Sequence, residues 1–168
     1  MIAKDACEEV DTMTEPSKPM TVAAIMSRDL ATLTAGDTLD LAGTLMSAAR
    51  IRHLPVVDAA GRLVGLVTHR DLLGATVSLS SDMSAKERMR FLGKVPIDRI
   101  MQSDVKTVRA DTPIVAAAHL ILEHKYGCLP VVDANGRLDG LVTEHDFVML
   151  AVRMLDRGSA SAPKGLGA

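Results

Sequence analysis

Apolar and polar positions along the chain follow one pattern that occurs twice. In each half, a short Thr-rich segment (31–34, then 106–109) precedes apolar residues at helical spacing, and two short apolar runs follow. Apolar residues three and four apart predict an amphipathic helix, whereas short apolar runs bounded by turn residues predict strands. The order β-α-β-β-α is therefore predicted twice, which is an α/β (α+β) fold class.

Individual residues refine these predicted elements. Leu41, Leu45 and Met46 have the spacing of one helix face in the first half. In the second half, Pro113 suits a first helical turn, where a missing N–H does no harm. The two apolar runs of each half are separated by a turn in which Gly61 or Gly136 can take a left-handed conformation.

The two halves are copies of each other. When the chain is shifted by 75 residues, LPVVDAAGRLVGLVTHRD (54–71) falls on LPVVDANGRLDGLVTEHD (129–146) without a gap. Over residues 22–74, 21 of 53 aligned positions are identical. Two units of this size are too few for a solenoid. We expect two similar small domains that pack against each other and cover apolar surface that neither buries alone.

The segment between the copies predicts a helix. Ser84 and Glu87 have the spacing of a capping box, and Gly93 is a typical C-terminal stop. The predicted organisation is a mobile N-terminal tail (1–20), repeat 1 (21–80), the linking helix (81–95), repeat 2 (96–156) and a mobile C-terminal tail (157–168). Pro, Ser, Gly and charged residues are frequent in both tails.

Composition narrows the function. The chain has 168 residues, 48% of them apolar, and a net charge of −2. Near-neutral charge and the scarcity of aromatic residues argue against nucleic-acid binding. No apolar run approaches the ~18 residues of a membrane helix, and the acidic N-terminus does not resemble a signal peptide. Cys7 and Cys128 suggest neither a disulfide framework nor a metal site, so we expect a cytoplasmic protein.

The stretch Gly-Leu-Val-Thr-x-x-Asp is the chemically distinctive part of each copy. Its letters His-Arg-Asp-Leu at 69–72 occur in kinase catalytic loops, but Thr76 stands where a kinase needs a metal-binding Asn. Thr68 and Asp71, like Thr143 and Asp146 in the second copy, have the spacing of a helix-capping box. A structural role as helix caps is the simpler interpretation of the motif. The functional alternative is an anion site at the helix start, where the carboxylate accepts hydrogen bonds from ribose hydroxyls.

The paired LPVVD and GLVT-x-x-D motifs resemble the cystathionine-β-synthase (CBS) domain in tandem, also called a Bateman module. The resemblance covers roughly residues 20–155. It implies two repeats joined through their sheets about a pseudo-two-fold axis. It also implies clefts for adenosine-containing ligands such as AMP, ADP, ATP or S-adenosylmethionine. Such modules regulate a partner protein, here expected to be a separate chain, and are not enzymes.

The resemblance also assigns roles to residues. It implies that Asp71 and Asp146 hold ribose hydroxyls beside Thr68 and Thr143. Ala31 matches a small residue that flanks adenine, and its counterpart is the bulky Lys106. The candidates for phosphate binding are Arg52, His53, Arg70 and His145. Because Gly127 and Cys128 stand opposite Arg52 and His53, we predict two unequal sites.

Other interpretations are weaker. The ligand types at His69, Asp71 and residues 144–146 lack the i, i+4 spacing of a zinc helix, so no metal site is predicted. Cys128 beside a core strand is expected to be buried, not a nucleophile. The main alternative function is a homodimerisation scaffold of the same fold with degenerate ligand sites. Apolar residues after both GLVT motifs would supply its interface, namely Leu72, Leu73, Phe147, Val148 and Leu150.

Overall fold

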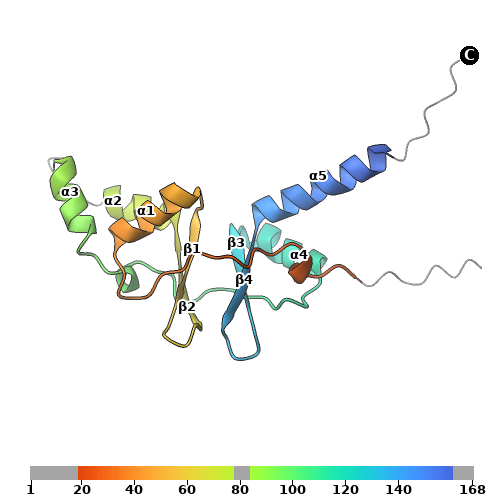
Figure 1. Cartoon of the computed structure of the whole chain (residues 1–168), viewed down its shortest axis with the longest axis horizontal. Helices are drawn as coiled ribbons and strands as arrows, with labels where there is room; N and C mark the ends of the chain where they lie inside the picture. The colour runs from red at the N-terminus through yellow and green to blue at the C-terminus, as the bar shows by residue number, and fades with distance from the viewer. Residues whose placement is uncertain (1–18, 78–83, 161–168) are drawn as a thin grey trace, which may run out of the picture.

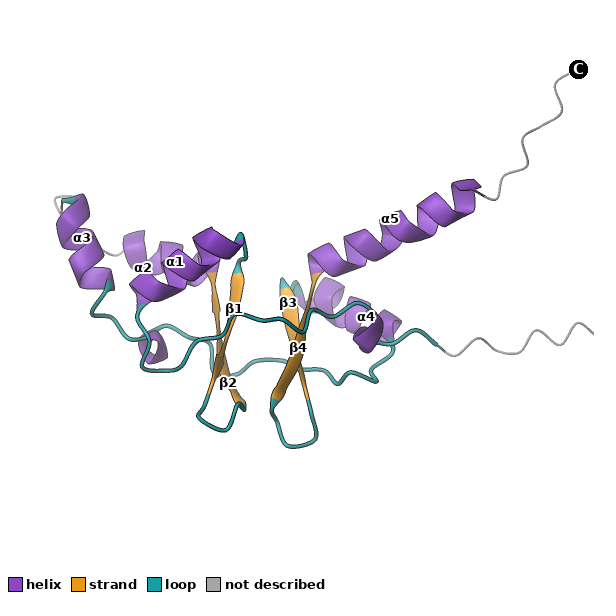
Figure 2. Ribbon diagram, viewed as in Figure 1, coloured by secondary structure: helices purple, strands orange, loops and turns teal. Residues whose placement is uncertain are grey.

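The computed structural model describes residues 19–77 and 84–160, and Figure 1 shows their arrangement. Two β-hairpins lie side by side in the middle, and helices flank them on both outer sides (Figure 2). Of the predicted tails (1–20 and 157–168), residues 1–18 and 161–168 fall outside the described residues. The helices are η1 (Val22–Ala24), α1 (Leu39–Ala49), α2 (His69–Val77), α3 (Ala85–Leu92), η2 (Ile97–Arg99), α4 (Ile114–His124) and α5 (Glu144–Ala160).

Each hairpin consists of two antiparallel strands. In the first, β1 (His53–Val57) pairs with β2 (Leu63–Thr68); in the second, β3 (Cys128–Val132) pairs with β4 (Leu138–Thr143). Both turns contain a glycine at φ 76°, Gly61 or Gly136, as the sequence predicted. A positive φ of this size is easily reached only by glycine, which explains its position in both copies.

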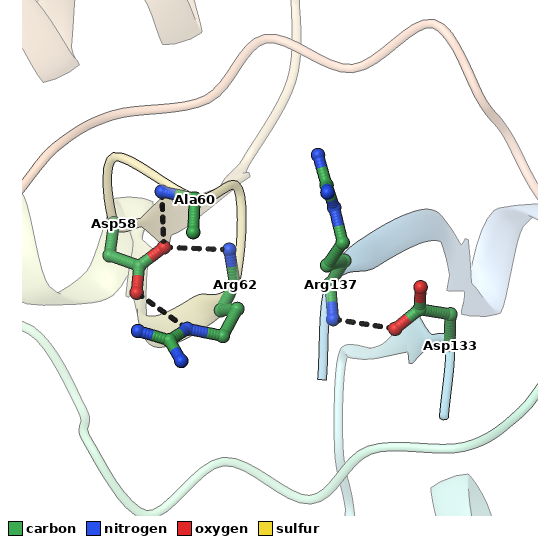
Figure 3. A network of polar contacts seen from close by, with 5 residues as sticks. All are labelled: Asp58, Ala60, Arg62, Asp133 and Arg137. Atoms are coloured by element: carbon green, nitrogen blue, oxygen red, sulfur yellow. Dashed lines mark hydrogen bonds and ion pairs between the residues drawn. The ribbon is translucent and has the colours of Figure 1, made fainter. Parts of the chain in front are cut away.

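The aspartate that ends each LPVVD run builds the turn after it (Figure 3). Asp58 Oδ1 accepts the backbone N–H groups of Ala60 and Arg62, both at 2.9 Å, and its Oδ2 accepts Arg62 Nε at 2.8 Å. In the second turn, Asp133 Oδ1 accepts the backbone N–H of Arg137 at 2.9 Å. The hydrogen bonds from Arg62 lower the pKa of Asp58, because they stabilise its charged form.

The first strand of each copy is shorter than predicted. Instead of strands over 31–34 and 106–109, the structure contains single parallel bridges from Leu33 to Val56 and from Val108 to Val131. Leu33 donates to the Pro55 carbonyl and accepts from the Val57 N–H. The next rung of the ladder would need an N–H from Pro55, which has none. Pro130 imposes the same limit in the second copy, so the prediction of extended first strands is wrong.

Helix α1 presents a different face to the core than predicted. Leu39, Ala42 and Met46 are buried, whereas Leu41 is 39% exposed. The helix starts at Leu39, after Thr38 accepts the Leu41 N–H at its side-chain oxygen. Ala42 and Met46, three and seven positions after Leu39, share its face of the helix, whereas Leu41, two positions after Leu39, does not. The inclusion of Leu41 in the buried stripe was therefore wrong.

The linking helix agrees with its sequence signature. Helix α3 begins directly after Ser84, whose N–H and hydroxyl donate to Glu87 Oε2 at 2.9 and 2.6 Å. The Glu87 N–H returns a bond of 3.3 Å to Ser84 Oγ, which completes the capping box. At the other end of the chain, α5 continues to Ala160, so residues 157–160 of the predicted tail are helical.

The first segment of each repeat packs on the other repeat. Val22 and Met26, in and beside η1, are buried in the cluster of α4, β3 and β4. Ile97 of η2 is buried in the cluster of α1, β1 and β2. Ser27 exchanges two backbone hydrogen bonds of 2.9 Å with Leu141 of β4. The two repeats are thus tied together by exchanged segments, and neither has a complete core by itself.

The hairpins also contact each other directly, with pseudo-two-fold symmetry. The Leu63 N–H donates to the Gly136 carbonyl and the Leu138 N–H to the Gly61 carbonyl, both at 3.0 Å. A shift of 75 residues converts the first of these bonds into the second. A small apolar cluster of Leu66, Cys128 and Leu141 is buried along the junction. The predicted α/β (α+β) fold with two repeats joined through their sheets is confirmed. Among the described residues, no helix is long and apolar enough to cross a bilayer.

Candidate ligand-binding clefts

The Thr-x-x-Asp motifs form helix caps in both copies. Asp146 Oδ2 accepts the Thr143 N–H at 2.7 Å and the Thr143 hydroxyl at 2.8 Å. Asp71 Oδ2 accepts the Thr68 N–H and hydroxyl, both at 2.7 Å. For both aspartates, Oδ1 accepts no hydrogen bond from the part of the chain that the structure describes. Each motif therefore caps its helix and still has one carboxylate oxygen for another partner.

A cleft of about 410 Å³ brings the two repeats together at the second motif. We call it the first cleft. Repeat 2 contributes Thr143, His145 and Asp146 from the start of α5, and repeat 1 contributes Arg52 and His53 from the start of β1. Its remaining walls are formed by Ser27, Asp29, Leu30, Ala31, Arg50, Ile51, Pro55, Gly127, Leu141 and Glu144. Apolar and small side chains thus lie in the same space as three carboxylates and two guanidinium groups.

The pseudo-symmetric cleft has about 490 Å³ and a different lining. We call it the second cleft. Thr68, His69 and Arg70 contribute to it from the start of α2, but Asp71 does not line it. Lys106 does not line it either. The other residues of its wall are Arg52, His53, Leu66, Leu73, Gln102, Lys125, Tyr126, Gly127, Cys128 and Glu144.

The two clefts share a wall made of Arg52, His53, Gly127 and Glu144. Backbone hydrogen bonds fix this wall to the helix starts, because His69 N–H donates to the Arg52 carbonyl at 2.9 Å and Glu144 N–H to the Gly127 carbonyl at 3.4 Å. Gly127 makes room for the imidazole: a Cβ there would lie 2.7 Å from His53 Nε2. The side chain of His53 therefore lies against the backbone of the opposite repeat.

Burial lowers the pKa of His53 below its ordinary value, and the neighbouring Arg52 lowers it further. The carboxylates of Glu144 and Asp71 oppose this shift without reversing it. At neutral pH, His53 is thus a neutral group in the shared wall. An anion placed against it would favour the protonated form and raise its pKa.

The predicted site residues are divided between the two clefts, except that Asp71 and Lys106 line neither. Arg52 and His53 line both clefts, Ala31 joins His145 and Asp146 in the first, and Arg70 lies in the second. Arg50 also lines the first cleft and Lys125 the second. These two basic residues were not predicted as cleft residues, although the 75-residue shift superposes them. Both adopt the left-handed conformation, at φ 55° and 56°, as the C-caps of α1 and α4.

Neither a metal cluster nor a reactive thiol is found among the residues that the structure describes. In residues 19–77 and 84–160, no group of three or more His, Cys, Asp or Glu side chains is placed to hold a metal ion. Cys128 is 6% exposed, and burial raises the pKa of its thiol to about 12. Because the thiolate is the reactive form, a thiol of this kind is a poor nucleophile. Cys128 is part of the apolar junction between the hairpins.

Comparison with known proteins identifies the repeats. The sequence profile of the CBS domain matches residues 22–78 and 97–153. The chain belongs to the CBS-domain family. A CBS domain-containing protein of Dictyostelium discoideum is 37% identical over 135 residues, which cover 80% of this chain and 93% of that protein. A homoserine O-acetyltransferase of Methanococcoides burtonii is 36% identical over 126 residues, but these cover 75% of this chain and only 23% of the enzyme.

Solved structures of CBS pairs have the same fold. CBSX2, a CBS-pair protein of Arabidopsis thaliana, was crystallised in complex with AMP. Its TM-score to this chain is 0.67 at 30% identity, with 80% of this chain and 97% of that chain covered. The CBS domain pair of protein MJ0100 has a TM-score of 0.69 at 27% identity, covering 82% and 99%, in complex with 5′-methylthioadenosine and S-adenosyl-L-methionine. CBS pairs similar to this one thus bind adenosine-containing ligands.

Proposed function

We propose that this CBS pair is a regulatory sensor that binds an adenosine-containing ligand in the first cleft and signals to a separate partner protein. The observation that carries the proposal is the meeting of Ala31, Arg52 and His53 of repeat 1 with Thr143 and Asp146 of repeat 2 in one cleft. Ligand in that cleft would contact both repeats. Its binding would stabilise their relative position, which is a property that a partner can detect.

The roles of the residues follow from their chemistry. Oδ1 of Asp146 would accept hydrogen bonds from the two ribose hydroxyls, since Oδ2 is already occupied by Thr143. Ala31, with the apolar side chains beside it, would lie along the adenine. Arg52 would bind a phosphate group through charge-assisted hydrogen bonds, which are stronger than neutral ones. His53 would support it when protonated.

Thermal unfolding in the presence of AMP, ADP, ATP and S-adenosylmethionine tests the proposal. A ligand at 100 times its dissociation constant adds about 2.7 kcal/mol to the free energy of unfolding. In a chain of this size, that raises the midpoint by roughly 5–10 °C. Asp146→Asn should remove the shift, because an amide has a single acceptor oxygen, which the Thr143 cap requires, and carries no charge.

Asp71→Asn is the matched control, since Asp71 has the same cap geometry but does not line the first cleft. It should lower the unfolding midpoint of the free protein as much as Asp146→Asn does and leave the ligand-induced shift intact. Equal loss of the shift in both variants, or no shift with any of the four ligands in the unmodified chain, would refute an adenosine site in the first cleft.

A dimerisation scaffold is the second candidate function, and one surface favours it. Helix α5 extends away from the hairpins (Figure 1) and exposes apolar side chains, with Val148 59%, Val152 45% and Met154 62% exposed. Exposed apolar surface on this scale indicates contact with another protein. Sedimentation of the chain and of Val148→Glu/Val152→Glu tests this. The scaffold function predicts a homodimer that dissociates in the variant and is insensitive to nucleotides.

A further inference from the structure

His53 occupies a place at the contact between the repeats that exists in one copy only. The 75-residue shift superposes Arg52 and His53 on Gly127 and Cys128. A Cβ at residue 127 would lie 2.7 Å from Nε2 and 3.1 Å from Cε1 of the imidazole, so the ring fills space that this glycine leaves free. The thiol at the counterpart position is buried, with its pKa raised to about 12. Of the two matched positions, only His53 can therefore change its charge near neutral pH.

Charged groups of both repeats surround the imidazole. Burial and Arg52 oppose its protonation, whereas Glu144 at the start of α5 and Asp71 in the first turn of α2 favour it. The other titratable or charged side chains that line the first cleft with it are Asp29, Arg50, His145 and Asp146. Those that line the second cleft with it are His69, Arg70, Lys125, Tyr126 and Cys128. In the free protein, burial and Arg52 prevail, and the ring is neutral at pH 7.

A phosphate group in the first cleft would reverse this balance. Arg52, which disfavours the protonated ring, is also the proposed phosphate ligand, so a bound phosphate compensates its charge and adds a negative charge beside the ring. The protonated imidazole also has two N–H donors, whereas the neutral one has a single donor. A phosphate-bearing ligand therefore binds the protonated form more tightly, and by reciprocity protons strengthen the binding of that ligand.

We infer that His53 makes recognition in the first cleft depend on pH, so that acidification strengthens the binding of adenosine ligands that carry phosphate and leaves the binding of phosphate-free adenosine unchanged. The inference rests on the proposed adenosine site and adds a regulation of that site. The module then responds to two signals, the concentration of its ligand and that of protons. His53 is the residue that determines how strongly phosphate is preferred.

Isothermal titration of the full chain with AMP and adenosine at pH 8 and pH 5.5 tests the inference. A charged donor in place of a neutral one changes affinity by about fivefold to tenfold. Between these pH values, the ratio of AMP affinities of the unmodified chain and His53→Gln should rise by this factor, from a ratio near one at pH 8. The phosphate of AMP has its own second ionisation near pH 6. The ratio removes that contribution, because it is the same for both chains. Adenosine should bind both chains equally at both pH values.

Proton NMR of the imidazole resonances in the unmodified chain measures the pKa of His53 directly and does not depend on the stability of a variant. Saturation with AMP should raise this pKa, because the bound phosphate favours the charged ring. Saturation with adenosine should leave it unchanged. A pKa of His53 that is the same with and without AMP would overturn the inference.

His119→Gln is the matched control, since His119 is exposed on α4 and lines neither cleft. It should leave the pH dependence of AMP affinity as it is in the unmodified chain. The inference is wrong if His53→Gln weakens AMP binding equally at both pH values, or if the pH dependence is lost in His145→Gln and kept in His53→Gln. Failure of both AMP and adenosine to bind at either pH would instead overturn the proposed adenosine site itself.

Discussion

The exchanged N-terminal segment passes close to β4 at Gly140. A Cβ at this residue would lie 2.8 Å from Met26 Sδ and 3.0 Å from the Ser27 carbonyl oxygen. The methionine can move by rotating its side chain. The carbonyl cannot, because it accepts the Leu141 N–H at 2.9 Å and belongs to a residue whose own N–H donates to the Leu141 carbonyl at 2.9 Å. We expect Gly140→Ala to break this junction.

The cost can be worked from these contacts. Two hydrogen bonds contribute about 1 kcal/mol each. Displacement of the buried Met26 is a case of overpacking, which costs about 1–3 kcal/mol. Reduced freedom of the unfolded chain offsets about 0.4–1 kcal/mol when Ala replaces Gly. Together these effects predict that Gly140→Ala lowers the free energy of unfolding by about 2–5 kcal/mol.

Urea unfolding followed by circular dichroism measures this loss. Gly43→Ala is the control, because a Cβ at Gly43 meets nothing within 4 Å and lies inside a helix, where Ala is favoured by up to about 1 kcal/mol. Gly65→Ala should resemble Gly140→Ala at the symmetric junction. Ser27 lines the first cleft and Gln102 the second, so ligand binding in the first cleft should suffer in Gly140→Ala and less in Gly65→Ala. If Gly140→Ala is as stable as the unmodified chain, the junction between Ser27 and Leu141 does not stabilise the folded state.

Three further predictions concern single side chains. The folded-state pKa of His53 is lowered, so the unfolded chain binds more protons, and the free energy of unfolding should be highest above pH 6.5 and fall as the pH drops through the folded pKa. Urea midpoints measured between pH 5 and 8 test this, because His53→Gln should reduce the dependence of the midpoint on pH. Thr143→Ala removes one donor to the Asp146 cap and should cost about 1 kcal/mol in thermal unfolding, whereas Thr143→Ser should restore most of it. In a Cys7→Ser background, Cys128 should not react with a thiol reagent at pH 8 until urea is added, and rapid native reaction would contradict its burial and its pKa of about 12.

Features that depend on a few neighbouring residues were predictable from the sequence. The hairpin turns at Gly61 and Gly136, the caps at Thr68 and Thr143, and the start of α3 after Ser84 all follow from contacts within four positions of the chain. The duplication was equally visible, because it is a property of the letters themselves. The strand over 31–34 was predicted too long, because Pro55 has no N–H to offer this segment, which lies more than twenty residues earlier in the chain.

Only the tertiary structure decided how the two copies share their parts. Val22 and Met26 complete the core of the second repeat, and Ile97 completes that of the first. The motifs Thr68–Asp71 and Thr143–Asp146 are locally alike, yet only Asp146 lines a cleft, and Arg52 meets it from 94 positions earlier in the chain. Similar local sequences acquire different surroundings when the halves differ at distant positions such as Ala31 and Lys106. Spacing along the chain fixes which residues cap a helix, but packing between distant segments fixes which of them face a ligand.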